Sequence, residues 1–298
     1  MVYPETTRRV PLSFVRHQRP MLAAIGRIAL GAVLPFARPK TNPSVFLPER
    51  RLISAPSDDL ATRYAAWSGT PDGYSNTLPP HMIAQWSIPL ATTVLRQTKY
   101  NLATIINQGV SLRINGDLPR GVPLQLGASI TRIEETAGRA RVSVALTTGT
   151  QTDPTIIEAV MESTFPLPGA PGEQRKTRPQ DVGDWDTIGS WRTSKEDGLN
   201  FALLTGDFNP IHWIGIAGKV SPFKTTVLQG FGMMARTFEA LDQDGRVDFV
   251  DVRFLKPVTL PSSDVAVQIS QSPNGGRVRV LGPDARLHLA GTYNLRAH

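Results

Sequence analysis

Apolar and polar positions along the chain repeat one pattern twice. Each copy has a short helical segment, a loop containing Gly and a longer apolar stretch, followed by four runs in which apolar and polar residues alternate. Alternation with a period of two predicts half-buried strands, and the longer stretches predict helices. The predicted helices cover 60–67 and 81–95, then 197–204 and 227–241. The predicted strands cover 109–114, 123–133, 140–147 and 155–165, then 247–255, 264–271, 277–281 and 287–295. A long helix followed by antiparallel strands is an α+β unit, so we expect two such units.

The two copies align residue by residue around the first helix and its loop. The segment Tyr64 to Thr70 matches Phe201 to Asp207 at an offset of 137, and at the same offset Ser75 stands opposite His212. The copies agree at the positions that form the helix and the start of its loop. They differ at two polar positions, where Thr70 matches Asp207 and Ser75 matches His212. This pattern predicts that the second copy performs chemistry and that the first keeps only the scaffold.

An arm and a linker complete the predicted organisation. Residues 166–184 are rich in Pro, Gly and charge, which is typical of an exposed linker. We predict an arm at 1–55, a first unit at 56–165, the linker at 166–184 and a second unit at 185–298. The arm holds one apolar run, Met21 to Leu34, which is shorter than the roughly 20 residues that a membrane-spanning helix needs. We expect a helix packed on the body. The alternatives are a signal peptide, or weak peripheral contact with an anionic membrane or with an acidic carrier protein.

The formal charge of +7 belongs to the arm. Residues 1–51 hold nine basic and two acidic residues, whereas the remainder balances at 23 of each (32 − 9 and 25 − 2). Because no nucleic-acid-binding motif accompanies this charge, we expect no nucleic acid partner. The chain has no Cys, which excludes disulfides, thiolate nucleophiles and cysteine-ligated zinc, and fits a reducing compartment. We expect a cytoplasmic location.

The loop after the second unit's first helix carries the candidate chemistry. Asp207 and His212 are five residues apart in a loop shaped by Gly206 and Pro210, so a carboxylate and an imidazole could share one space. Such a pair can hold a water molecule and move its proton, as the addition of water to a double bond requires. Spacing alone also allows a structural interpretation, in which Asp207 caps a turn and His212 is packed or solvated.

A longer motif favours the chemical interpretation. The string TGDFNPIH is followed, eighteen residues after His212, by Gly230 and later by VDVRFLKPVTLP at 250–261. These segments resemble MaoC-like dehydratases and (R)-specific enoyl-CoA hydratases, the hydratase 2 group, and the two-copy layout is similar to double-hotdog (3R)-hydroxyacyl-thioester dehydratases. The resemblance implies a double hotdog fold and the reversible hydration of trans-2-enoyl thioesters carried on coenzyme A or acyl carrier protein. It assigns the binding and polarisation of the water to Asp207 and His212. Asn209 matches a motif position that holds the loop in place, and we also predict Asn209 to be a substrate-binding residue.

Gly230 has a separate physical argument. It is predicted to begin the second long helix, where backbone N–H groups lack intrahelical partners and the helix dipole is positive. An N–H group there could stabilise a thioester oxygen as enolate character develops. The alternative is a glycine required by tight packing. The stretch also matches the dinucleotide pattern GxGxxA, but no clear βαβ unit surrounds it and hydration needs no redox cofactor, so we expect no cofactor.

Other residues receive weaker assignments. Arg253 and Lys256 could bind a pantetheine phosphate, although basic residues at strand ends are usually solvated. The remaining His residues show no ligand spacing, so no metal site is predicted. Gln229 stands where the family commonly has His, and Phe238 where some single-hotdog relatives have Ser. Pro89 should kink the first long helix, which could then line an acyl tunnel or simply be packed.

Three functions remain open at this stage. The leading one is a hydratase or dehydratase of (3R)-hydroxyacyl thioesters in fatty acid metabolism. A hotdog thioesterase would need a carboxylate on the central helix, where Glu239 is the only acid well inside. The third is a non-catalytic subunit that binds acyl thioesters. Beyond the thioester substrate, we expect a homodimer as a further partner.

Overall fold

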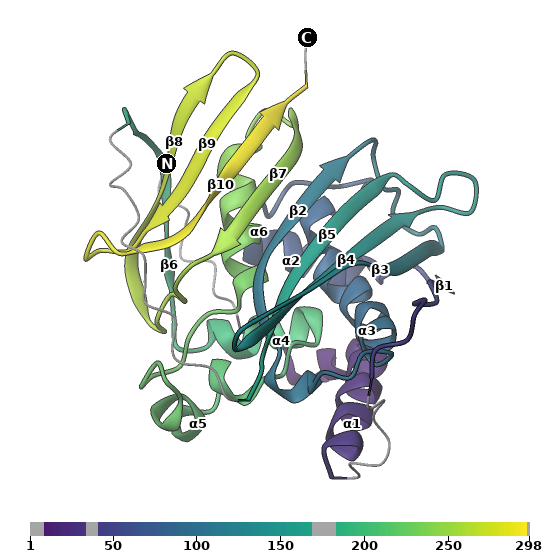
Figure 1. Ribbon diagram of the computed structural model, residues 1–298. Coiled ribbons are helices and arrows are strands. Elements are labelled where there is room, and N and C mark those ends of the chain that lie inside the picture. The colour runs from purple at the N-terminus through teal and green to yellow at the C-terminus, as the bar shows by residue number, and fades with distance from the viewer. Residues whose placement is uncertain (1–8, 34–40, 169–182, 297–298) are drawn as a thin grey trace.

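In the computed structural model, one large antiparallel sheet holds both units. The structure describes residues 9–33, 41–168 and 183–296, so most of the predicted linker lies outside the described residues. The ten strands lie in the order β1-β3-β4-β5-β2-β7-β10-β9-β8-β6, and the helices gather on one face of this curved sheet (Figure 1). The architecture is α+β, as the pattern predicts.

The first unit supplies half of the sheet. Its helices are α2 (Asp58–Ser68) and α3 (Ala84–Leu95), with short 3₁₀ turns at η3 (Pro80–Ile83) and η4 (Leu102–Thr104). Its strands are β1 (Glu49–Ile53), β2 (Ile106–Ile114), β3 (Leu124–Thr136), β4 (Arg139–Gly149) and β5 (Ile157–Pro166). The apolar face of α3, including the fully buried Leu90 and Val94, packs against β3 and β4, since the alternating residues of those strands turn Leu126, Val142 and Val144 toward it.

The second unit repeats this order with one addition. Its helices are α4 (Asp197–Thr205), α5 (Gly215–Val220) and α6 (Gly230–Leu241), with a 3₁₀ turn at η5 (Pro210–His212). Its strands are β6 (Asp186–Thr193), β7 (Val247–Phe254), β8 (Ser262–Ser272), β9 (Gly275–Leu281) and β10 (Leu287–Leu295). The five strands of each unit occupy matching places on either side of the β2–β7 pair, which joins the halves between Gly109 and Arg113 of β2.

The eight predicted strands are confirmed, and two strands escaped prediction. These are β1 and β6, which start 137 residues apart and form the two outer edges of the sheet. Both long helices are confirmed, and Pro89 lies inside α3.

The arm forms a helix on the body, as expected. The 3₁₀ turn η1 (Leu12–Gln18) leads into α1 (Arg19–Val33), and α1 buries Met21 and Ala24. The side-chain amide of Gln18 donates to the carbonyl oxygen of Leu203 (2.8 Å), and Asn200 accepts from the backbone N–H of Val10 (3.0 Å). The arm is therefore fastened to α4, close to the candidate loop. No helix in the described parts of the chain is long and apolar enough to cross a bilayer.

Candidate active site

The candidate loop begins where α4 ends at a glycine. Gly206 is the C-cap of α4 with φ of 87°, a left-handed conformation that glycine adopts without steric cost. Its backbone N–H donates to the carbonyl oxygen of Ala202 and so ends the helix. The chain then turns outward, which places Asp207 in a half-buried position directly after the helix.

Asn209 organises the loop between the two candidate catalytic residues. Its side-chain oxygen accepts from the N–H of Ile211 (3.3 Å) and caps η5, the turn that contains His212. The N–H of Asn209 in turn donates to Oδ1 of Asp207 (3.4 Å). These bonds give Asn209 a positioning role, while direct substrate binding by Asn209 stays a prediction.

Asp207 and His212 are both bonded to the segment that precedes Gly230. Nδ1 of His212 lies 2.7 Å from the carbonyl oxygen of Val227, and the side-chain amide of Gln229 donates to the carbonyl oxygen of Asp207 (3.3 Å). The same amide donates to the carbonyl oxygen of Gly198 (2.9 Å). The structure therefore brings the two candidate residues to the start of α6, the place predicted for Gly230.

The contact with Val227 also decides the chemistry of the imidazole. A carbonyl oxygen can only accept, so Nδ1 carries the proton and, in the neutral ring, Nε2 keeps a lone pair. His212 is buried to 9% exposure, and no hydrogen-bond partner of Nε2 is found among the described residues. One oxygen of Asp207 likewise stays unbonded when Oδ1 accepts from Asn209. The pair has one open acceptor on each side chain.

Gly198 explains why the loop can approach the helix so closely. A Cβ atom at Gly198 would lie 1.8 Å from the carbonyl oxygen of His212, a distance that no real contact shows. Glycine at the second position of α4 is therefore required for His212 to reach Val227.

Gly230 begins α6, as predicted, and it has a packing reason to be glycine. A Cβ atom at this position would lie 2.7 Å from the ring of Phe254 at the end of β7. Gln229, the N-cap, makes no capping hydrogen bond from its side chain, so the first-turn N–H groups of α6 receive no bond from it. The packing interpretation of Gly230 is thus supported, and the use of its N–H by a substrate remains a prediction.

Comparisons with known proteins give a matched family model and similar folds. Residues 167–277 match the family model described as MaoC like domain, a range that contains Asp207, Asn209, His212, Gly230, Arg253 and Lys256. This region of the C-terminal half is similar to the MaoC like domain over 111 of the 298 residues of the chain (277 − 166). No curated protein sequence matches the chain significantly.

Solved structures extend the likeness to both units. HtdX of Mycobacterium tuberculosis superposes with a TM-score of 0.69 at 17% identity, covering 83% of this chain and all of that protein. A MaoC-like dehydratase from Phytophthora capsici gives 0.69 at 16%, covering 85% and 97%. A conserved hypothetical protein of M. tuberculosis with a double hotdog fold gives 0.56 at 12%, covering 85% and 97%. The fold of this chain is the double hotdog.

The first unit has no counterpart of the pair Asp207 and His212. At the position of Asp207 stands Thr70, whose hydroxyl donates to Oε2 of Glu239 on α6. Oε1 of Glu239 accepts from Nε2 of His81 (2.8 Å) and from Ser68 (3.2 Å). Tyr64 packs on the other side of His81, with its hydroxyl 3.2 Å from Nδ1. We name Tyr64, Ser68, Thr70, His81 and Glu239 the buried brace, since it ties the first unit's loop to the second unit's helix.

The buried brace removes Glu239 from consideration as a thioesterase carboxylate. Its side chain is 3% exposed and both oxygens accept hydrogen bonds. Burial opposes its ionisation, but the bonds from His81, Thr70 and Ser68 outweigh that effect and hold the pKa of Glu239 below its ordinary value. Burial, followed by the charges of Glu239 and Asp242, raises the pKa of the nearby Tyr74 well above its ordinary value.

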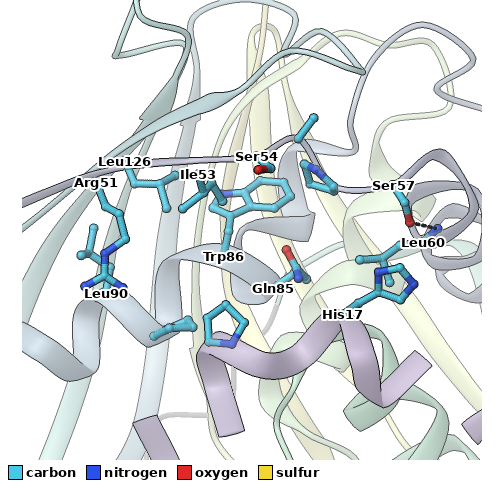
Figure 2. A pocket seen from close by; sticks show the side chains of 14 residues that line it. His17, Arg51, Ile53, Ser54, Ser57, Leu60, Gln85, Trp86, Leu90 and Leu126 are labelled. Carbon is cyan, nitrogen blue, oxygen red and sulfur yellow. Dashed lines mark hydrogen bonds between the residues drawn. The ribbon is translucent and has the colours of Figure 1, made fainter. Parts of the chain in front are cut away.

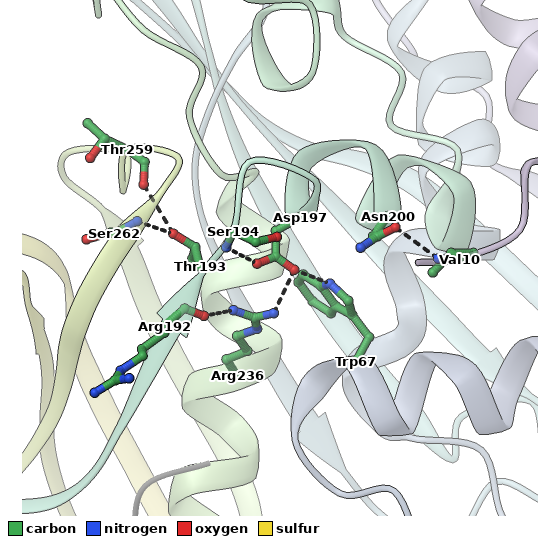
Figure 3. A network of polar contacts seen from close by, with 10 residues as sticks. All are labelled: Val10, Trp67, Arg192, Thr193, Ser194, Asp197, Asn200, Arg236, Thr259 and Ser262. Atoms are coloured by element: carbon green, nitrogen blue, oxygen red, sulfur yellow. Dashed lines mark hydrogen bonds and ion pairs between the residues drawn. The ribbon is translucent and has the colours of Figure 1, made fainter. Parts of the chain in front are cut away.

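A second polar network joins the MaoC-like domain to the first unit (Figure 3). Oδ1 of the buried Asp197 on α4 accepts from Nε1 of Trp67 (2.8 Å) on α2 and from the guanidinium of Arg236 (3.0 Å) on α6. The guanidinium also lies 4.3 Å from the Trp67 ring. The buried ion pair therefore joins α4 to α6, and the indole N–H of Trp67 joins α2 to the same carboxylate.

Arg253 is an exposed residue of β7, and Lys256 is exposed two residues after the end of this strand. The alkyl stem of Arg253 lies against Gly109 of β2, and the backbone of Lys256 pairs with His288. No contact of either residue with Asp207 or His212 is found in the described chain. Their role as substrate ligands stays a prediction.

A pocket of about 300 Å³ lies in the other half of the molecule (Figure 2). All of its lining residues belong to the arm or the first unit, including Trp86, Pro89 and Leu90 of α3, Arg51 and Ile53 of β1, and His17 and Pro20 of the arm. Pro89 therefore lines a pocket, which agrees with the open space predicted beside it. No contact among the described residues connects this pocket with Asp207.

The buried brace and the hydrogen bonds of Gln229 are not recognisable in the sequence. His81 and Glu239 are 158 residues apart and show no shared motif, so only the packing of the two units reveals them. In the sequence Gln229 is only a departure from the family pattern, yet its amide donates to the carbonyl oxygens of Gly198 and Asp207. Among the described residues, no cluster of three or more His, Asp or Glu could hold a metal ion.

Proposed function

We propose that this protein catalyses the reversible addition of water to trans-2-enoyl thioesters, giving (3R)-hydroxyacyl thioesters. One observation carries the proposal: Asp207 and His212 are each bonded to residues 227–229, directly before the N-terminus of α6. The imidazole of His212 and the backbone of Asp207 are thereby held beside the start of a helix, and we place the Asp207 carboxylate at the same position. These are the groups that hydration of a conjugated thioester requires.

The reaction follows from the open positions of these groups. A water molecule donates to Nε2 of His212 and to the free oxygen of Asp207, which raises the nucleophilicity of its oxygen. Hydroxide adds to the β-carbon, the C=C π bond breaks, and the proton taken from water is returned to the α-carbon. Negative charge passes through the thioester oxygen, where the N–H of Gly230 donates. Both the hydroxide and the proton of the water molecule are added to the substrate, so the reaction needs no redox partner.

The substrate's carrier and chain length belong to the same proposal. Arg253 and Lys256 offer cations for the phosphate of a pantetheine group on coenzyme A or acyl carrier protein. The pocket beside Pro89 supplies volume for a longer acyl chain along α3. Activity that persists beyond four-carbon substrates supports this use of the first unit, and strict preference for four carbons contradicts it.

A direct assay tests the reaction. Loss of the conjugated enoyl absorbance without release of free thiol is the expected result with enoyl thioesters of coenzyme A and acyl carrier protein. Release of free thiol would instead indicate a thioesterase, and binding without turnover would indicate a non-catalytic subunit. The Asp207→Asn variant, with an unchanged fold by circular dichroism, provides the control for contaminating activity.

A further inference from the structure

The second unit contains an insertion beside its catalytic loop. The offset between the units is 137 residues from Thr70 to Asp207 but 146 from Ala84 to Gly230, the first residues of α3 and α6. Nine additional residues therefore lie between the loop and the central helix. They accommodate α5, which begins three residues after His212 and has no counterpart in the first unit.

One face of α5 is fastened to the body and the opposite face carries aliphatic side chains into solvent. A Cβ atom at Gly218 would lie 2.5 Å from the backbone nitrogen of Thr226, so this side of α5 packs directly on the chain beneath it. Ile216 and Val220 are four residues apart and share the outward face, where each is 77% exposed. Water-exposed aliphatic groups of this size on a fixed helix indicate a surface for a partner.

Further apolar and basic side chains surround this face. Trp213, Ile214 and Phe223 flank α5 and are all more than one-third exposed. Lys219 and Lys224 are exposed among them, and residues 208–238 contain no Asp or Glu. We name residues 213–224 the apolar cap. Its charge is entirely positive.

The arm presents a second surface of the same kind. Leu12, Val15 and Leu22 are exposed, Leu12 to 70%, and Arg16 and Arg19 are exposed between them. The arm touches the catalytic loop, since a Cβ atom at Gly206 would lie 2.7 Å from Cβ of Met21. In Figure 1, α5 and α1 both project at the lower edge of the molecule.

We propose that the apolar cap, aided by the arm, binds the surface of an anionic membrane and positions the loop of Asp207 and His212 there. Because α5 follows His212 directly, such binding would hold the catalytic loop at the bilayer, where long acyl thioesters partition. This positioning rests on the proposed function, whereas the membrane binding itself does not.

The composition of the cap favours lipid over a protein partner. Aliphatic side chains with Trp, Phe and Lys, and with no acids, are the composition of segments that lie at a membrane interface. Each basic residue near an anionic surface adds attraction that salt weakens. A second copy of this chain would bring the same positive charges against each other, which disfavours pairing of the cap with itself.

Vesicle sedimentation tests the proposal on the full chain. We expect the protein to sediment with vesicles of phosphatidylglycerol and phosphatidylcholine, less in 0.5 M salt, and not with phosphatidylcholine alone. The double variant Ile216→Ser/Val220→Ser should bind about tenfold more weakly, since it removes the aliphatic groups that would insert. Lys219→Glu/Lys224→Glu should weaken binding by about tenfold or more.

Matched variants distinguish specific membrane binding from nonspecific adsorption. They also distinguish a failure of the membrane proposal from a failure of the hydratase proposal. Val45→Ser/Leu47→Ser removes two aliphatic side chains of similar exposure (71% and 67%) outside the cap and should leave binding unchanged. Asp207→Asn should abolish hydration of a short soluble enoyl-CoA yet sediment like the wild type. Binding by the native protein that the Ile216→Ser/Val220→Ser change leaves intact would overturn the proposal. So would capture by an acidic carrier protein without vesicle binding, or a cap-dependent dimer in its place.

Discussion

The loops after Gly69 and Gly206 begin alike and end differently. Both glycines end a helix with positive φ, 130° and 87°, and both loops lead to a long central helix. In the first unit the next side chain, Thr70, is bonded to Glu239 of the other unit and joins the buried brace. In the second unit Asp207 and His212 each keep an open acceptor. Two loops with the same position in their units can therefore hold either a cross-link between the units or side chains with open acceptors, and the residues at two positions decide which.

The largest expected effect comes from breaking the buried brace. Glu239→Ala leaves His81 without its carboxylate in a fully buried position, and we expect a loss of about 3–5 kcal/mol in the free energy of unfolding, measured by urea titration. Glu239 has a lowered pKa, so its stabilisation is present above the ordinary value of 4.5 and declines as the pH falls through the lower folded-state pKa. The gap between variant and wild type should shrink in acid. If it instead widens, the assigned ionisation is wrong.

A double variant checks that the loss arises from the pair. His81→Leu/Glu239→Met removes both polar partners, and should cost less than Glu239→Ala because no lone polar group is left buried. Equal or greater loss in the double variant would mean that packing, not the pair, accounts for the effect.

Chemistry should depend on one loop only. Asp207→Asn or His212→Ala should lower turnover of enoyl thioesters by about 100-fold or more, since each removes a group that moves or orients a proton. Ser75→Ala, at the position matching His212, should stay within about twofold because Ser75 is an exposed residue of the loop without such a role. Initial rates from enoyl absorbance provide the measurement. A loss of rate in Ser75→Ala comparable to that in His212→Ala would show that both loops serve the reaction.

The two loop glycines allow a smaller test of the comparison. Gly69→Ala and Gly206→Ala each force an L-residue to positive φ, at a cost of about 1–2 kcal/mol. Gly206→Ala should cost about 1 kcal/mol more, because its Cβ would collide with Met21 and push the arm from α4. Urea titration gives the stability difference, and faster proteolysis near Met21 in Gly206→Ala alone would report release of the arm. Equal costs would mean that the arm adapts without strain.

The smallest expected change concerns Asp242, the residue that directly follows α6. Burial raises the pKa of Asp242 to about 6, with the charge of Glu239 adding to it and the N–H of Val247 opposing it. Because a raised acid pKa costs stability as the pH rises through it, Asp242→Asn should stabilise the protein at pH 7 by about 1 kcal/mol after allowance for solvent screening. The gain should vanish near pH 4. A gain of equal size at both pH values would refute an electrostatic origin.

Much of the fold was predictable because one face of each strand is buried. Alternation made eight strands and the repeat visible in the sequence. The two missed strands are edge strands with weak patterns: β1 is short with Arg50 and Arg51 exposed, and β6 interrupts its apolar residues with Gly189 and Ser190. An edge strand has one neighbour only, so its side chains carry less of the burial signal.

The site was predictable only where chemistry and local sequence coincide. Asp207, His212 and Gly230 lie within 24 positions of one another, and a motif can record them. The bonds of Gln229 to two carbonyl groups, the ring of Phe254 over Gly230 and the pairing of His81 with Glu239 all depend on how distant segments pack. No local pattern contains that information.

The seam between β2 and β7 has a consequence for how the molecule loses its structure. Five residue pairs along this seam make the two halves a single hydrogen-bonded layer, and a Cβ atom at Gly109 would lie only 2.2 Å from the carbonyl oxygen of Val252 across it. Separation of the two halves would remove the hydrogen-bonding partner of β2 in the first unit and of β7 in the second. The N–H and C=O groups exposed on both strands could then pair with other molecules. The two units thus share one hydrogen-bonded layer, and we expect damage to the first unit to destabilise the second.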